Sequence, residues 1–148
     1  LDLDERKTKH AKAAAFAAGY AGLVFREHDA AAGTLPEFRG NIALFDALHY
    51  LRATAQQTLL AQLAVRIATG GMLLLRDCPR DGSPRFWATY IAEKFAQAIS
   101  WNVAVPLEFP TRHSINAAFA ENHFTRAERP MHSGGPFNNS LFIIRRER

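Results

Sequence analysis

The sequence predicts an α/β fold, a three-layer sandwich whose mostly parallel sheet is closed by an antiparallel hairpin. Three features predict it: a strand, helix and strand unit at residues 41–77, a Gly-Gly turn inside that unit, and a hairpin at the end of the chain. Strands that alternate with helices form parallel sheets, because each crossover helix returns the chain to the same edge. The terminal hairpin adds an antiparallel pair, so a mixed sheet is expected.

The first half of the 41–77 unit reads as an apolar strand followed by a capped helix. Residues 42–45 are almost unbroken apolar sequence, which is typical of a strand buried on both faces, and Asp46 ends the run. Thr54 and Gln57 have the spacing of a capping box, in which two side chains satisfy backbone donors at a helix start. A helix is therefore expected to begin near Ala55.

The second half returns the chain to the sheet. Apolar residues recur at helical spacing from Leu60 to Ile67 and are expected to cover the sheet, whereas Gln56 is expected to face outward. Gly70 and Gly71 end the helix, because glycine adopts left-handed backbone conformations at little cost. Met72–Leu75 is then a second buried strand, which makes the unit a βαβ crossover.

The flanking segments supply further elements. A helix with Asp4 as its N-cap is expected to run to about Gly19, and residues 23–25 read as a strand. After Asp77 an aromatic-rich helix is expected, followed by a second helix over residues 111–123. Residues 126–131 and 139–144 form the hairpin, across a Gly-rich loop.

The order of these parts resembles a known enzyme family. IALFDALHYL, then a helix, then TGGMLLLRD is similar to the class I S-adenosylmethionine-dependent methyltransferases. The resemblance implies a Rossmann-like sheet with a reversed last strand, S-adenosylmethionine as cofactor, and methyl transfer to a small acceptor. An NAD(P)-dependent oxidoreductase, the less favoured enzyme class, would instead continue with parallel strands.

The resemblance also implies a cofactor site at the carboxyl ends of the strands. Its residues are Asp2, Leu3, Asp29, Ala30, Phe45 and Asp46. Asp2 matches the acidic residue that accepts hydrogen bonds from both ribose hydroxyls, and Asp29 matches the one that accepts from the adenine amino group. Phe45 and Asp46 would border the methionine part. Two alternatives remain open: Asp2 simply starts a helix, and Asp29 makes an ordinary loop turn.

Four residues are candidates for the acceptor side. His49 and Tyr50 follow the first strand of the unit, where ligands of open α/β sheets bind. His49 is either a proton acceptor or a turn histidine that packs against the following helix. Trp87 and Tyr90 share a face of the aromatic helix and either cover an apolar or aromatic acceptor or fill the core. No catalytic residue is assigned, and no histidine and carboxylate spacing indicates a metal site.

The family's glycine-rich loop after its first strand has no counterpart in the sequence. The chain is therefore expected to be an N-terminally truncated fragment that lacks the first strand and helix, with methyl transfer belonging to a longer parent protein. Residues 1–77 would form the cofactor side of one partial domain, 78–123 the acceptor-covering helices, and 124–148 the hairpin. The alternative is a non-catalytic relic or binding module of the same fold.

The composition of the chain bears on which classes of protein it can belong to. With 48% hydrophobic and 22% charged residues and no long apolar run, the chain is expected to be soluble rather than membrane-spanning. The net charge of +4 is dispersed, which makes nucleic-acid binding an unfavoured function. The single cysteine, Cys78, excludes an internal disulfide and favours a cytoplasmic location. The sequence leaves the oligomeric state open.

Overall fold

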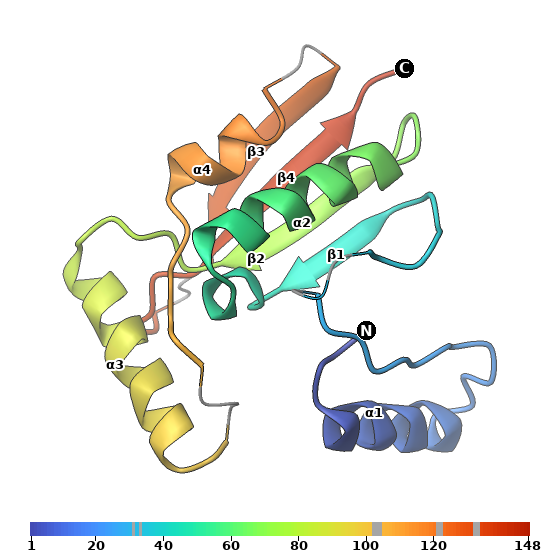
Figure 1. Ribbon diagram of the computed structural model, residues 1–148, viewed down its shortest axis with the longest axis horizontal. Coiled ribbons are helices and arrows are strands. Elements are labelled where there is room, and N and C mark those ends of the chain that lie inside the picture. Colours follow the sequence, from blue (N-terminus) through green and yellow to red (C-terminus); the bar gives the residue numbers. More distant parts are fainter. Residues whose placement is uncertain (31, 33, 102–104, 121–122, 132–133) are drawn as a thin grey trace. The chain divides into compact units, whose positions relative to one another are not determined.

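The chain is described by a computed structural model (Figure 1) that covers residues 1–30, 32, 34–101, 105–120, 123–131 and 134–148. It divides into two compact units, residues 1–35 and residues 36–148. Within the described residues, every helix is too short or too polar to cross a lipid bilayer.

The first unit is built around helix α1 (Glu5–Ala17). Its N-cap is Asp4, as predicted, and the Asp4 carboxylate accepts a hydrogen bond from the Arg6 N–H at 2.9 Å. Gly19 follows the helix end with a φ of 80°, a conformation that favours glycine. No residue of α1 is buried within the chain. The predicted helix is thus confirmed, but its apolar side chains gain little from packing.

The strand predicted at residues 23–25 is wrong. A single parallel bridge joins Asp2 to Glu27, through hydrogen bonds from Asp2 N–H to Arg26 O at 3.3 Å and from His28 N–H to Asp2 O at 2.9 Å. A strand needs a ladder of partners along its length. The bridge lies at Glu27, beyond residues 23–25, so these three residues form no strand.

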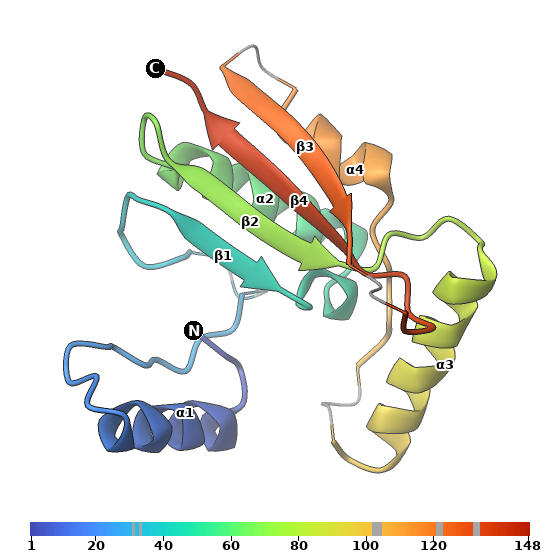
Figure 2. The ribbon, with the colours of Figure 1, turned by 180° about the vertical axis from the view of Figure 1, so that it is seen from behind.

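The second unit contains a four-stranded mixed sheet. Its strands are β1 (Ile42–Phe45), β2 (Met72–Asp77), β3 (Phe124–Pro130) and β4 (Ser140–Arg146), in the order β1-β2-β4-β3 (Figure 2). β1 and β2 are parallel, and β4 runs antiparallel to both β2 and β3. The reversed last strand confirms the predicted hairpin and contradicts the all-parallel continuation expected for the oxidoreductase fold.

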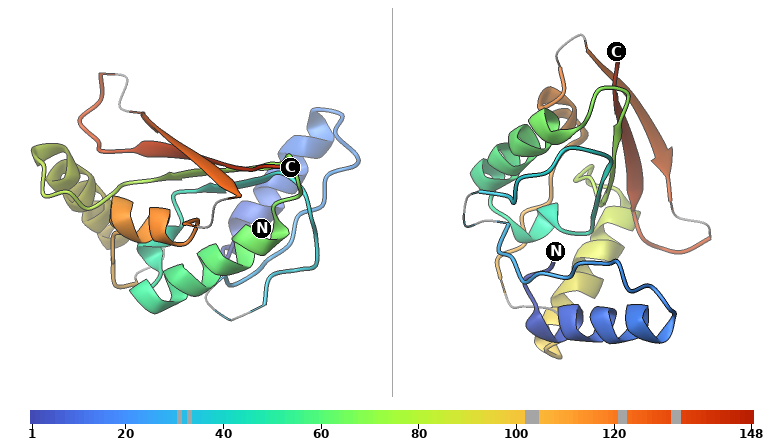
Figure 3. Two further views of the ribbon diagram at one scale, coloured as in Figure 1. Left: turned by 90° about the horizontal axis from the view of Figure 1, so that it is seen from above. Right: turned by 90° about the vertical axis from the view of Figure 1, so that its right-hand side faces the viewer.

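The helices of the second unit lie on one face of the sheet and beyond its end. Helix α2 (Ala53–Arg66) connects β1 to β2 and lies on the same face as the short α4 (Arg112–Ala117) (Figure 3). Helix α3 (Pro84–Ala98) lies beyond the carboxyl ends of β1 and β2, next to the 3-10 helix η1 (Leu48–Tyr50) (Figures 1 and 2). Of the three layers of the predicted sandwich, the described part of this unit therefore supplies two: the sheet and one layer of helices.

The core lies between this face of the sheet and α2. Alternate residues of β2 and β4 are buried, namely Leu73, Leu75, Phe142 and Ile144. Leu60 and Leu63 of α2, Ile67 directly after the helix, and Phe119 are buried as well. Burying one such side chain contributes about 1.5–3 kcal/mol. The predicted apolar spacing of α2 is confirmed.

Three details of the predicted elements are wrong. β1 alternates between half-buried and exposed residues instead of being buried on both faces, because only β2 pairs with it in the described residues. Helix α2 begins at Ala53 with Arg52 as N-cap and no side-chain cap, so the Thr54–Gln57 box does not form. Helix α4, which was predicted over residues 111–123, ends at Ala117. Its capping box pairs Thr111 with Ser114.

The Gly-Gly turn before β2 is confirmed and has a steric reason. Gly70 has a φ of 75°, which disfavours other residues. A Cβ on Gly71 would lie only 2.9 Å from the Ala68 carbonyl oxygen, and backbone atoms cannot yield as a flexible side chain would. The two glycines therefore let the chain leave α2 and enter the sheet within a few residues.

Candidate functional site

The candidate site of the second unit is the edge where β1 and β2 end. Asp46 follows β1, and Asp77 is the last residue of β2. Because the strands are parallel, these two carboxylates come to the same edge, and η1 and α3 follow them there. Ligands of open α/β sheets bind outside the carboxyl ends of the strands, so this edge is the expected position for chemistry.

Asp46 and Phe45, both predicted to contact cofactor, are held by Arg76. The Arg76 guanidinium makes a two-pronged ion pair with the Asp46 carboxylate, with Nε donating to Oδ1 at 3.0 Å. It also lies over the Phe45 ring, 5.3 Å from the centroid. Asp46 has a φ of 52°, in the left-handed region that only a few residue types tolerate. A fixed charged pair thus stands where the first strand ends.

Asp77 is fully buried and is the acceptor for three donors. Its Oδ2 accepts from the Leu48 N–H at 2.9 Å, and its Oδ1 accepts from the Cys78 N–H and from His49 Nδ1, both at 2.8 Å. An ionised carboxylate can only accept, which places a proton on His49 Nδ1. The carboxylate therefore fixes the η1 turn against the end of β2.

His49 is only 3% exposed and is enclosed by aromatic rings. Its ring stacks on Phe109, with centroids 5.0 Å apart and planes 7° from parallel, and it touches the Tyr50 ring. His49 Nε2 lies 3.9 Å from Glu93 Oε1, and the Tyr50 hydroxyl donates to Glu93 Oε2 at 2.6 Å. The His49 ring is thus held between Phe109 and Asp77, and its role as a proton acceptor or as a packed turn histidine stays a prediction.

The charges around His49 set its protonation. Burial lowers the pKa of the imidazole, but the hydrogen bond to Asp77 and the negative charges of Asp77, Glu93 and Asp46 outweigh this, so its pKa is raised above 6.5. Burial and the Glu93 carboxylate together raise the pKa of the Tyr50 hydroxyl. Tyr50 therefore stays a neutral donor over the physiological pH range.

A raised histidine pKa makes stability depend on pH. The protonated His49 contributes its full stabilisation below pH 6.5, its unfolded value, and this is lost as the pH rises through the higher folded pKa. Urea unfolding across this range should therefore show the wild type losing stability with rising pH, and His49→Gln losing markedly less. Equal pH slopes in the two proteins would contradict the assignment.

Gln56, expected to face solvent, is buried and binds backbone carbonyls. Its side-chain amide donates to Leu48 O at 3.1 Å, to Leu51 O at 3.0 Å and to Glu108 O at 2.5 Å. The outward prediction was wrong because helical periodicity assigns polar residues to the surface and cannot anticipate carbonyls that need a buried donor.

The other predicted cofactor residues lie in the first unit. Asp2 is exposed, and its Oδ1 accepts from the Asp4 N–H at 2.8 Å. The parallel bridge to Glu27 runs both segments in the same direction, so Leu3 and the pair Asp29 and Ala30 follow the bridge on the same side. The structure thus groups these four residues in one unit, and Phe45 with Asp46 in the other.

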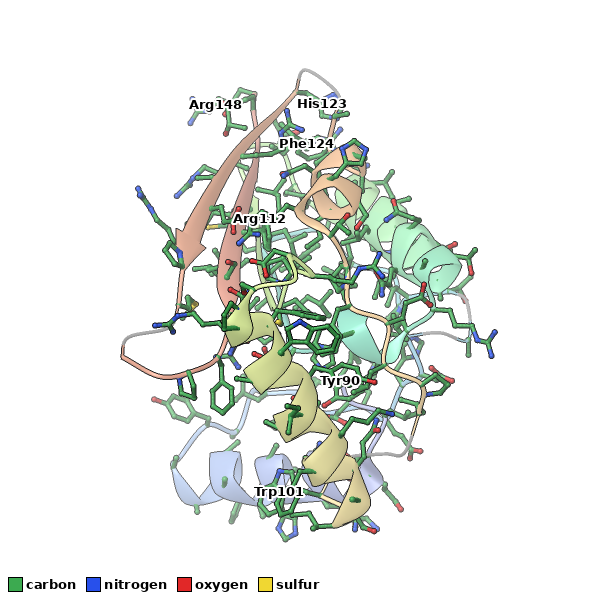
Figure 4. The ribbon with its side chains drawn as sticks, turned by 90° about the vertical axis from the view of Figure 1, so that its left-hand side faces the viewer. Tyr90, Trp101, Arg112, His123, Phe124 and Arg148 are labelled. Carbon is green, nitrogen blue, oxygen red and sulfur yellow. The ribbon has the colours of Figure 1, made fainter. Side chains whose placement is uncertain are left out.

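The two predicted acceptor residues on α3 differ in burial. Trp87 is 53% exposed, whereas Tyr90 (labelled in Figure 4) is half-buried against the cluster formed by Cys78, Phe86 and Phe109. The Trp87 and Tyr90 rings meet edge to face at 5.8 Å. Burial raises the pKa of the Cys78 thiol to about 12, so this cysteine is packing rather than a nucleophile.

No metal site marks this edge in the described residues. No group of three or more His, Cys, Asp or Glu side chains there could hold a metal ion. A shallow hollow of about 520 Å³ lies instead near the start of β1, lined by Glu37, Phe38, Arg39, Val65 and Arg66. It sits at the opposite end of the strand from Asp46.

Sequence reasoning missed the polar residues that support the candidate site. They are Gln56, Arg76, Asp77, Glu93 and the carbonyl of Glu108. One signal was available: Arg76 and Asp77 are charged residues at the carboxyl end of an otherwise apolar strand, where ligand sites form. Gln56 and Glu93 sit on helices among many other polar residues, and no local pattern distinguishes them.

Solved structures identify the architecture. Mitomycin 7-O-methyltransferase MmcR superimposes with a TM-score of 0.71 at 15% identity, over 99% of this chain and 41% of its own. An O-methyltransferase family protein from Burkholderia thailandensis gives 0.68 at 19% identity, over 99% and 42%. The fold is that of the class I methyltransferases. Magnesium protoporphyrin IX methyltransferase from Synechocystis PCC 6803 also has this methyltransferase fold, with 0.68 at 14% identity over 98% and 61%.

The match to the methyltransferase fold spans nearly all of this chain but only part of each solved protein, about two fifths of the first two. Neither a protein-family profile nor a curated protein matches the chain. The likeness therefore concerns the fold, and the activity is a separate question.

Proposed function

We propose that this chain is the cofactor-binding part of a longer methyltransferase, which transfers a methyl group from S-adenosylmethionine to a small apolar or aromatic acceptor. The observation that supports this most is the sheet, with parallel β1 and β2 followed by a reversed β4 in the order of the methyltransferase fold. Solved structures with that fold include some that hold S-adenosylmethionine or S-adenosylhomocysteine.

The first unit offers groups that suit the adenosine part of the cofactor. Asp2 is exposed, and each oxygen of a carboxylate accepts more than one hydrogen bond, so Oδ1 can serve both Asp4 N–H and a ribose hydroxyl while Oδ2 takes the second hydroxyl. Leu3 is an exposed apolar neighbour for a purine face. Asp29 and Ala30 would border the adenine amino group. Phe45 and Asp46, clamped by Arg76, would border the methionine part.

The chemistry requires alignment more than proton transfer. The sulfonium of S-adenosylmethionine, when bound, would supply an activated methyl group for attack by the acceptor, with S-adenosylhomocysteine as the leaving group. The residues of this chain would then hold the two reactants in line, which is where most of the rate gain in such reactions comes from. His49 and Tyr50 would lie near the acceptor, beyond the carboxyl ends of β1 and β2. Trp87 and Tyr90 would cover the acceptor. No residue need form a covalent intermediate.

The cofactor assignment predicts the effect of one substitution. In the longer parent protein, Asp2→Ala should weaken binding of S-adenosylhomocysteine by about 1.5–3 kcal/mol, the range for hydrogen bonds to a charged group. Titration calorimetry measures this. Glu5→Ala is the matched control, because Glu5 is an exposed acid three residues further along the chain that pairs with Lys9 and is not assigned to the site.

The outcomes of this titration separate the functions. Equal affinities for wild type and Asp2→Ala would remove the ribose role. A properly folded protein that binds neither S-adenosylmethionine nor S-adenosylhomocysteine would favour the non-catalytic binding module. A cytoplasmic location and the absence of nucleic-acid binding remain predictions, resting on the single cysteine and on the dispersed charge.

A further inference from the structure

Gln56 is the polar residue of α2 that points away from solvent. Its exposed fraction is 2%, and it lies in the first turn of the helix, where its backbone N–H donates to Arg52 O at 2.9 Å. Its side chain carries two N–H groups but contacts three carbonyl oxygens, so at least one hydrogen is shared. A buried polar residue with this many partners does more than fill space.

The three carbonyls belong to two segments that are far apart in the sequence. Leu48 is the first residue of η1 and Leu51 is its C-cap, whereas Glu108 lies in the segment that leads to Phe109. The same two segments are joined by a backbone hydrogen bond from Glu108 N–H to His49 O at 2.9 Å. The side chain of Gln56 and this backbone hydrogen bond therefore form a ring of hydrogen bonds, the Gln56 circuit, which holds the η1 turn and the 107–110 segment at a fixed separation.

His49 lies inside this circuit. Its ring stacks on Phe109, which directly follows Glu108 in the chain. Its Nδ1 donates to Asp77, the same carboxylate that accepts from the Leu48 N–H. If the turn moved relative to the 107–110 segment, the stacking with Phe109 and the hydrogen bond to Asp77 would both be disturbed. Burial of the carbonyls makes a donor necessary, since an unpaired buried polar group costs about 1–3 kcal/mol.

We propose that Gln56 is a positioning residue for the candidate methyl-transfer site, which holds the His49 ring between Asp77 and Phe109 by binding the carbonyls of Leu48, Leu51 and Glu108. The inference rests on the proposed function only in treating this edge as the acceptor side. The positioning itself is a property of the chain without any ligand, and so it can be tested when no cofactor is present.

The test is an NMR titration of the imidazole nitrogens of His49 in the 148-residue chain, labelled with ¹⁵N and free of cofactor. Gln56→Met keeps the volume of the side chain but removes the donors. The structure predicts that His49 in Gln56→Met titrates at a lower pH than in wild type, closer to 6.5, because contact with Asp77 and the other negative groups, Glu93 and Asp46, is loosened. The ¹⁵N signature of a protonated Nδ1 should weaken as well.

The neighbouring Gln57 provides a matched control. It is exposed and donates to Ser114 O at 3.2 Å, away from the η1 turn, so Gln57→Met should leave the His49 titration unchanged. A folded Gln56→Met protein with the His49 midpoint and nitrogen signature of wild type would overturn the proposal, because a merely structural glutamine would change stability alone. Neither result depends on whether the protein binds S-adenosylmethionine.

If Gln56→Met does not fold, hydrogen exchange in the wild type decides the matter. The side-chain amide hydrogens of Gln56 should exchange with solvent at least tenfold more slowly than those of Gln57, because they are buried and bound to carbonyls. Equal exchange rates for the two side chains would overturn the proposal.

Discussion

Replacing Asp77 by alanine is expected to lower the free energy of unfolding by about 3–5 kcal/mol, the range for removing one partner of a buried charged pair. The carboxylate is completely buried and accepts from three donors at 2.8–2.9 Å. Alanine would leave the backbone N–H groups of Leu48 and Cys78 unsatisfied and the His49 ring without its partner. Urea unfolding at neutral pH, followed by circular dichroism, measures the loss.

Glu108→Ala is the control for Asp77, because its carboxylate is exposed on the segment that packs against His49. Surface substitutions of this kind usually change stability by no more than about 0.5 kcal/mol. A loss below about 1 kcal/mol for Asp77→Ala would mean that water reaches the three donors. The η1 turn would then not depend on the carboxylate, and the arrangement inferred for His49 would fail with it.

Phe86→Ala is expected to cost about 3–5 kcal/mol, as truncation of a buried aromatic does. Phe86 is 5% exposed and packs edge to face on Phe109, with centroids 5.3 Å apart. Its neighbour Trp87 is 53% exposed, so Trp87→Ala should cost only about 1 kcal/mol, mainly from its lost edge contacts. Thermal melts of the two variants test this contrast directly.

The contrast also bears on the acceptor. If Trp87 covers an acceptor, Trp87→Ala in the longer parent protein should raise the Michaelis constant for that acceptor much more than it weakens the binding of S-adenosylhomocysteine. A Trp87→Ala protein that is destabilised as strongly as Phe86→Ala would make Trp87 a core residue. The acceptor role of Trp87 would then have no support.

The parts of the fold that follow from strong local patterns were predictable. The apolar runs at β1 and β2, the spacing of Leu60 and Leu63 and the turn at Gly70 all depend on neighbours in the sequence. The hairpin followed from two β-rich runs around a Gly-rich loop; the bounds of its strands differ from the prediction by two residues at most, and the pairing of Arg126 with Ile144 agrees with it. These elements were predictable because the spacing of apolar residues and the backbone preferences of glycine depend on residues close together in the sequence.

The supporting polar network was not predictable, because its partners are distant in the sequence. Gln56 donates to a carbonyl 52 positions away, and Tyr50 donates to a carboxylate 43 positions away. Helical periodicity predicted an exposed Gln56, because it assigns polar residues to the surface. It contains no information on distant buried carbonyls that need a hydrogen-bond donor. The strand expected at residues 23–25 failed for a related reason: β-propensity describes a segment, whereas a strand requires a partner of matching length.

The most direct test of the proposed function is an NMR titration of the ¹⁵N-labelled chain with millimolar S-adenosylhomocysteine, which detects weak as well as tight binding. Amide shifts should concentrate at residues 2–4, 28–30 and 45–50, and an equal concentration of NAD should produce much smaller ones. Shifts confined to the hollow at residues 37–39 and 65–66, or no shifts in a folded chain, would contradict a cofactor site at the carboxyl ends of the strands.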